Sequence, residues 1–289
     1  MKLNGNILLY LGFALAAVII IFYLLFPSEL LRDVLEERVA QINPDLTVMT
    51  GTIQPTIPPG FKLQPLSISH TDFPLLRSDY LKLTPNLFSL LTNPKVFYLK
   101  GTMGNGDFKG RGEINRKSKR PQEKLTLNLD EISVETFEIF KHWPKYQPSG
   151  ELSGRINYDS LKGSGGTVEA DVRITPFRIT LNPPLMGLET LDFSELKALM
   201  VMTPRMLQIR RCEASGSQLE GKLTGSIGFS KPLGSSRITL SLTVKPQPGF
   251  AAQHKNDMIG GFFASDKAQK RGILLRFSGT LDHPSYRIR

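Results

Sequence analysis

The stretch Leu219-Glu-Gly-Lys-Leu-Thr-Gly-Ser-Ile-Gly-Phe229 decides the fold class. Its polar residues occupy every second position as far as Ser226, and apolar or glycine residues stand between them. Because successive side chains of a strand point to opposite faces, the pattern predicts a strand with an apolar inner face and a polar outer face. The inner set is Leu219, Gly221, Leu223, Gly225, Ile227 and Phe229.

The same stretch, taken from Gly216, comes within one residue of the phosphate-binding pattern G-x-x-x-x-G-K-[ST]. Leu223 stands where the pattern needs a hydroxyl for Mg²⁺, and the hydroxyl of Thr224 comes one position late. A phosphate loop also needs a helix that opens at the lysine. Here the strand pattern runs straight through Lys222, so we expect no nucleotide site.

Alternation of this kind recurs along the chain. The segment 159–166 is rich in glycine and serine, and it separates two such stretches, which predicts a hairpin. Residues 195–202 also fit a helix by the spacing of Leu196, Leu199 and Met200, but the turn-like Thr203-Pro-Arg205 favours a second hairpin. The other alternating stretches are residues 124–130, 152–158, 168–174 and 237–245.

Glycines recur on the inner face, in segments 107–114, 150–156 and 221–227. We interpret these segments as loose repeats of a curved, largely antiparallel, meandering sheet, so the fold is expected to be mainly β. Because each glycine weakens a strand, it must either bend the sheet or make room for a molecule against the concave face. The candidate contacts with lipid or a partner strand are Leu219, Gly221, Leu223, Gly225 and Ile227.

One or two short helices are expected as well. Residues 27–44 predict an amphipathic helix with Ser28 as its cap and an Arg32–Glu36 pair on its surface. Residues 133–143 predict a second helix that ends before Pro144. Prolines between residues 55 and 65 instead favour short extended pieces.

The apolar run from Ile7 to Phe26 contains no charge and is long enough for a transmembrane helix. A cleavable signal would have a shorter apolar core and a small-x-small site, which Phe22–Pro27 does not provide. We therefore expect three segments. Residues 1–26 form a cytoplasmic tail and anchor, residues 27–44 the helix, and residues 45–289 a periplasmic β-rich domain, with a subdivision near 144–149 as an option.

The net charge of +10 suits an anionic membrane surface or an acidic partner. Its densest cluster, formed by Arg116, Lys117, Lys119 and Arg120, could contact lipid headgroups, although a solvated loop has the same composition. Nucleic acid is a poor candidate partner. The sequence has no finger or recognition-helix signature, and its anchor points the domain away from the cytoplasm.

Residues suited to catalysis or metal binding do not form a recognisable motif. The four histidines are far apart and form no H-x₃₋₅-H or H-E-x-x-H pair. Cys212 is the only cysteine, so no intrachain disulfide can form. Neighbouring carboxylates such as Asp130-Glu131 are no denser than a solvated face requires. We expect no metal, no cofactor and no enzymatic activity.

Several patches together resemble the N protein of bacterial type II secretion systems, in the form found in delta-proteobacteria. The patches are residues 26–31 after the apolar run, Pro55-Thr-Ile-Pro-Pro-Gly-Phe61, residues 221–242 and Phe277-Ser-Gly-Thr-Leu-Asp-His-Pro284. The resemblance implies a single-pass inner-membrane protein with a periplasmic β-rich domain in the machinery that exports folded proteins. Similar Gly-x-Leu patterns occur in AsmA-like proteins, which are linked to lipid handling.

Two functions follow from these expectations. In the first, the protein is a non-enzymatic subunit of the secretion apparatus, and its sheet edges pair with other secretion-system subunits. In the second, it is an AsmA-like module that binds or transfers lipid in the cell envelope. An apolar face that forms an open groove would favour lipid binding, whereas a closed core would count against it.

Overall fold

The structure of the chain is a computed structural model. It describes residues 10, 13, 14, 17, 21, 23, 25–42, 46–70, 73–117, 120–141, 144–163, 165–185, 187–253, 261, 263 and 265–288.

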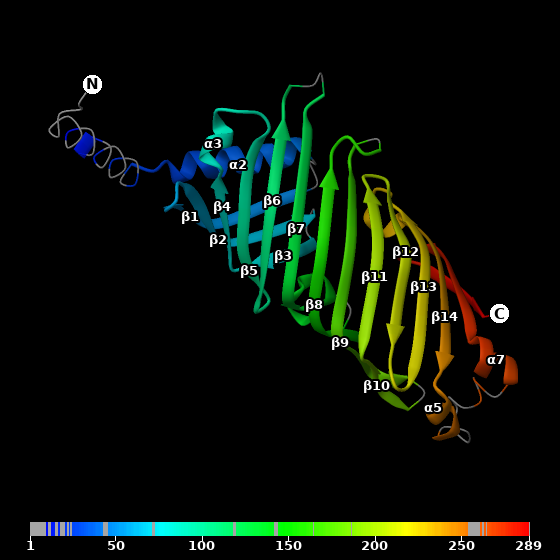
Figure 1. Cartoon of the computed structure of the whole chain (residues 1–289). Helices are drawn as coiled ribbons and strands as arrows, with labels where there is room; N and C mark the ends of the chain where they lie inside the picture. The colour runs from blue at the N-terminus through cyan, green and yellow to red at the C-terminus, as the bar shows by residue number, and fades with distance from the viewer. Residues whose placement is uncertain are drawn as a thin grey trace.

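The described residues form one sheet of 16 strands, in which every neighbouring pair is antiparallel. Figure 1 shows it as a long, twisted sheet with the N-terminal strands at one extreme and the C-terminal strands at the other. The strands are β1 (Leu46–Thr56), β2 (Gly60–His70), β3 (Phe73–Ser78), β4 (Tyr80–Pro85), β5 (Lys95–Met103), β6 (Gly106–Asn115), β7 (Gln122–Ser133), β8 (Tyr146–Asp159), β9 (Thr167–Leu185), β10 (Leu188–Phe193), β11 (Glu195–Thr203), β12 (Met206–Ser215), β13 (Leu219–Gly228), β14 (Arg237–Pro246), β15 (Ile273–Thr280) and β16 (Pro284–Ile288).

The sheet is a meander, as the alternation predicts. Two positions interrupt the simple order, because β3 and β4 pair with successive parts of β2, and β10 and β11 pair with successive parts of β9. Both predicted hairpins are confirmed, since β8 pairs with β9 and β11 pairs with β12. The sheet also runs without a break through residues 146–149, where β8 pairs with β9.

The helices are short and lie between strands or before the sheet. Figure 1 shows α2 beside the N-terminal strands, and α5 and α7 at the C-terminal end. They are α2 (Ser28–Ile42), α3 (Leu87–Leu90), α4 (Glu138–Lys141), α5 (Pro248–Gln253) and α7 (Asp266–Arg271), with 3₁₀ turns η1 (Val134–Thr136) and η2 (Leu233–Ser235).

The predicted helix within residues 27–44 is confirmed as α2, which packs against β1. Two details differ from the prediction. The carbonyl of Pro27 accepts from the N–H of Leu31 at 3.1 Å, so Ser28 is the first helical residue rather than the cap. Arg32 does not pair with Glu36 but donates through Nη2 to the carbonyl of Gly51 at 2.6 Å. The arginine therefore ties the helix to β1.

The continuous helix predicted for residues 133–143 is wrong. The segment forms η1 and then α4, with Phe137 between them in an extended conformation (φ −69°, ψ 118°). Val134 in η1 is buried, and η1 packs against β8, so this part of the segment stays with the sheet. His142 and Trp143, at the end of the predicted helix, lie outside the described residues.

The predicted membrane segment, Ile7–Phe26, falls largely outside the described residues. In the part of the chain that the structure describes, no helix has the length and apolar character needed to cross a membrane.

Candidate functional site

The strand register aligns apolar residues of thirteen strands into one row. Each member lies directly opposite the next, and none of them carries a charge. We call this set the central apolar row. From β2 to β16 its members are Phe61, Leu83, Leu99, Gly110, Leu127, Ile156, Ala170, Met200, Ile209, Gly225, Leu240, Phe277 and Tyr286.

One further apolar row lies on each side of the central one, two residues away along each strand that it crosses, except on β12, where a bulge places Cys212 three residues from Ile209. Together the three rows form what we call the apolar face, and no charged residue belongs to it. The first flanking row is Leu63, Leu81, Gly101, Phe108, Leu129, Gly154, Val172, Ala198, Cys212, Leu223, Leu242, Leu275 and Ile288. The second is Pro85, Phe97, Gly112, Leu125, Tyr158, Val168, Met202, Leu207, Ile227, Ile238, Gly279 and Pro284.

The middle of the apolar face is open. Every member of the central apolar row from Phe61 to Phe277 is half-buried, none is buried, and Tyr286 at the free edge is 68% exposed. The central side chains of a closed core would be fully covered on all sides. At about 4.8 Å between neighbouring strands, the row extends for roughly 60 Å. The apolar face is therefore a long, partly uncovered surface.

A small closed core covers one end of this surface. It contains Leu219, Phe250, Phe263, Ala268 and Ile273, which are all buried. Helices α5 and α7 supply Phe250 and Ala268, and side chains of β10 pack against the cluster. These elements cover the ends of β13, β14 and β15 beside the first flanking row, whereas β16 at the free edge of the sheet is exposed.

The five predicted contact residues on β13 are thereby divided. Leu219 belongs to the closed core and is only 8% exposed. Leu223, Gly225 and Ile227 belong to the three rows of the apolar face and are half-buried. Gly221 lies one step further along β13, opposite Ala214 on β12 and Val244 on β14.

Gly221 and Gly225 have different roles. The backbone of Gly225 has a φ of +140°, beside a bulge in β12 between Ile209 and Cys212. A Cβ there would also come within 2.8 Å of the Leu240 Cα. Gly225 therefore allows a bend that other residues resist. A Cβ at Gly221 would meet only the Ala214 Cβ, at 3.7 Å, so neither conformation nor space requires glycine at that position.

The predicted basic cluster lies in the loop between β6 and β7. Arg116, Lys117 and Arg120 are exposed, and Lys119 lies outside the described residues. The loop is held by backbone N–H donation from Arg116 to Asn93 Oδ1 at 3.4 Å and from Lys117 to Asn115 Oδ1 at 3.1 Å.

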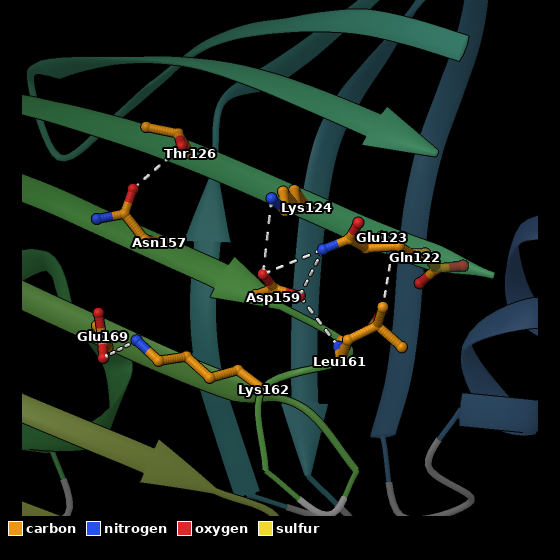
Figure 2. Close-up of polar contacts among 10 residues, drawn as sticks. Gln122, Glu123, Lys124, Thr126, Asn157, Asp159, Leu161, Lys162 and Glu169 are labelled. Carbon is orange, nitrogen blue, oxygen red and sulfur yellow. Dashed lines mark hydrogen bonds and ion pairs between the residues drawn. The ribbon is translucent and has the colours of Figure 1, made fainter. Parts of the chain in front are cut away.

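The polar face carries an ion-pair network at the ends of β7, β8 and β9, around an open depression of about 220 Å³. Lys124 Nζ lies 3.8 Å from Asp159 Oδ2, and Lys162 Nζ lies 2.5 Å from Glu169 Oε1. Figure 2 shows both ion pairs. Asp159 also accepts from the backbone N–H of Leu161 at 3.0 Å. These contacts hold the β8–β9 loop to the sheet, which is a structural role.

Two pKa shifts accompany this network. The hydrogen bond from Lys162, together with its charge, lowers the pKa of Glu169. Burial, followed by the charges of Glu123 and Asp159, raises the pKa of Tyr158. The Glu169 carboxylate is therefore ionised near pH 7, and the Tyr158 phenol is neutral. Within the described residues, no group of three or more His, Cys, Asp or Glu side chains is arranged to hold a metal ion.

Sequence reasoning missed most of the apolar face as a site. Leu127 and Ile156 were expected on the inner faces of strands, but nothing indicated that they lie opposite each other in a row that spans the sheet. Alternation within one strand is a local signal. The alignment of rows between strands depends on register, for which the repeated glycine segments were the only sign.

No protein-family model matches the chain, and neither the curated proteins nor the solved structures yield a significant match.

Proposed function

We propose that the protein is a membrane-anchored protein of the bacterial envelope whose apolar face binds the acyl chains of lipids. The observation that carries the proposal is the half-buried central apolar row, which extends across the sheet without a charge. Apolar surface left in water is unfavourable in proportion to its area. Large exposed apolar patches accordingly mark sites for ligands, membranes or partner proteins.

The form of the face suits acyl chains better than a compact ligand. It is long and narrow, with apolar residues in all three rows and polar residues only on the opposite side of the strands. An acyl chain needs apolar contact along its length and no fixed hydrogen-bonding group. The likeness to AsmA-like proteins in the Gly-x-Leu pattern supports the same interpretation.

In this proposal the apolar segment Ile7–Phe26 is a transmembrane helix in the inner membrane. Residues 27–289 then lie in the periplasm, and α2 connects the anchor to β1. The sheet would shield acyl chains from water near the membrane, either while they are stored or while they move along the face. This activity requires no catalytic residue and no cofactor.

Photo-crosslinking in living cells tests the proposal. A benzophenone amino acid is placed at position 127 or 156, on the apolar face, and at 126 or 157 as the matched control. Thr126 and Asn157 lie opposite each other on the polar face of the same two strands. We expect phospholipid adducts at 127 and 156 and none at 126 and 157. Equal labelling of both faces, or no adduct at any position, would refute lipid binding here.

A second function, as a non-enzymatic subunit of a type II secretion system, is favoured by the free edge at β16. All five residues of this strand are exposed, and it pairs on one side with β15. An exposed edge strand can pair with a strand of another protein. Deleting the gene tests this function, because unchanged export of folded proteins across the outer membrane would exclude a required role.

A further inference from the structure

The register also aligns four lysines on the polar face, near the N-terminal end of the sheet. Lys62 on β2 lies opposite Lys82 on β4, Lys82 lies opposite Lys100 on β5, and Lys100 lies opposite Lys109 on β6. We call these four residues the lysine row. It extends over four neighbouring strands, so its positions are spaced at about 4.8 Å.

This arrangement is unfavourable for the sheet itself, because like charges directly opposite each other destabilise a strand pair. Among the described residues, none of the four lysines forms an ion pair with a carboxylate. Lys62 lies 4.5 Å from the centroid of the Tyr80 ring, and Lys82 donates to the carbonyl of Ile57 at 3.2 Å. Neither contact neutralises a charge, and Lys100 and Lys109 are exposed.

No carboxylate lies directly opposite a member of the lysine row. The nearest carboxylates in the adjacent row, Asp107 and Asp130, lie opposite each other rather than opposite a lysine. Two lysines on the later strands β11 and β13, by contrast, are paired. Lys197 lies 2.6 Å from Glu195, and Lys222 lies 3.3 Å from Glu213. The lysine row is therefore a run of four directly opposite cations, none of which has an ion pair among the described residues.

We propose that the lysine row binds anionic phospholipid headgroups and holds the N-terminal end of the sheet against the bilayer. The inference rests on the membrane anchor of the proposed function. The row begins on β2, which pairs with β1, and α2 joins β1 to the apolar segment. An anchored chain therefore keeps these lysines near the headgroups, where each one strengthens attraction to an anionic surface about fivefold.

Lysine acetylation in nanodiscs tests the inference. The full-length protein is reconstituted into discs of phosphatidylcholine alone and into discs that also contain phosphatidylglycerol. A water-soluble N-hydroxysuccinimide ester labels the lysines, and mass spectrometry gives the rate at each one. We expect labelling of Lys100 and Lys109 to slow several-fold in the anionic discs only, and high salt to remove the effect. Lys197 and Lys222 should react equally in both discs.

Two double variants provide matched controls. Lys100→Gln/Lys109→Gln should remove the anionic-lipid protection of Lys62 and Lys82, whereas Lys197→Gln/Lys222→Gln, with the same loss of charge, should preserve it. Equal labelling of the wild type in the two discs would overturn the inference, and an acidic protein would then be the better partner.

Co-elution of the protein with either disc tests separately whether the chain is anchored in the membrane. Failure to co-elute would refute the anchor and the lysine row together, whereas co-elution without protection would refute the lysine row alone.

Discussion

The ring of Phe97 on β5 lies over Gly112, its directly opposite partner on β6. A Cβ at position 112 would overlap the ring, so the glycine makes room for the aromatic side chain on the apolar face. We expect Gly112→Ala to lower the free energy of unfolding by about 1–3 kcal/mol, because the ring must move off its rotamer. Urea unfolding of the detergent-solubilised protein measures the change. If Gly112→Ala costs as much stability in a Phe97→Leu background as in the wild type, the contact with the ring is not the cause.

Gly225 and Gly221 provide a second comparison on one strand. Gly225→Ala should destabilise the protein by roughly 1–3 kcal/mol, because alanine resists a φ of +140°. Gly221→Ala should change the unfolding free energy by less than about 0.5 kcal/mol, since its nearest neighbour leaves ordinary contact distance. Thermal or urea unfolding distinguishes the two variants. If the two variants lost the same unfolding free energy, the backbone bend at position 225 would not explain why glycine is needed there.

The openness of the apolar face can be measured through stability. Leu127 is half-buried in the central apolar row, whereas Ile132 on the same strand is fully buried. We expect Ile132→Ala to cost about 2–5 kcal/mol, as in a closed core. Leu127→Ala should cost only about 1 kcal/mol, because water already reaches part of the side chain. A cost for Leu127→Ala that matches Ile132→Ala would show that the face is closed.

The thiol of Cys212 makes a prediction about pH. Burial, with a smaller contribution from the charge of Glu213, raises the pKa of this thiol. The folded state therefore favours the neutral thiol. The contribution of the Cys212 thiol to stability is complete below its pKa in the unfolded chain and is lost as the pH rises through its pKa in the folded protein.

Iodoacetamide labelling of Cys212, followed by mass spectrometry, should show half-maximal rates at a higher pH in the folded protein than in urea. Cys212→Ala should flatten the decline of stability at alkaline pH, and an unchanged decline would contradict the linkage.

Local patterns predicted much of this fold correctly. Alternation from Leu219 to Ile227 predicted a strand through Lys222, and the turn at Thr203–Arg205 predicted the hairpin of β11 and β12. The 3.6-residue period predicted α2. These predictions succeeded because strand alternation and helix amphipathicity depend on residues that are neighbours in the chain.

Predictions that depend on distant residues were less complete. The helix expected at residues 133–143 is broken at Phe137, and the 3₁₀ turn before it packs against β8 with Val134 buried. Leu219 and Leu223 seemed equivalent because alternation places them on the same face of the strand. Leu219 nevertheless belongs to the closed core with Phe250 and Phe263, which are distant in sequence, and Leu223 does not. Which side chains are covered depends on what packs over them, and a single strand carries no sign of that.

By itself, the sequence determined several of the strands, such as β8, β9 and β13, and which side of each is apolar, because side-chain direction alternates along a strand. The tertiary structure alone decided how the strands align, and with that the central apolar row and the lysine row. A shift of one residue in any pairing between β2 and β6 would break both rows, because it would exchange the two faces of that strand. Register arises from contacts between strands, so only the folded sheet brings Leu127 opposite Ile156 and Lys100 opposite Lys109.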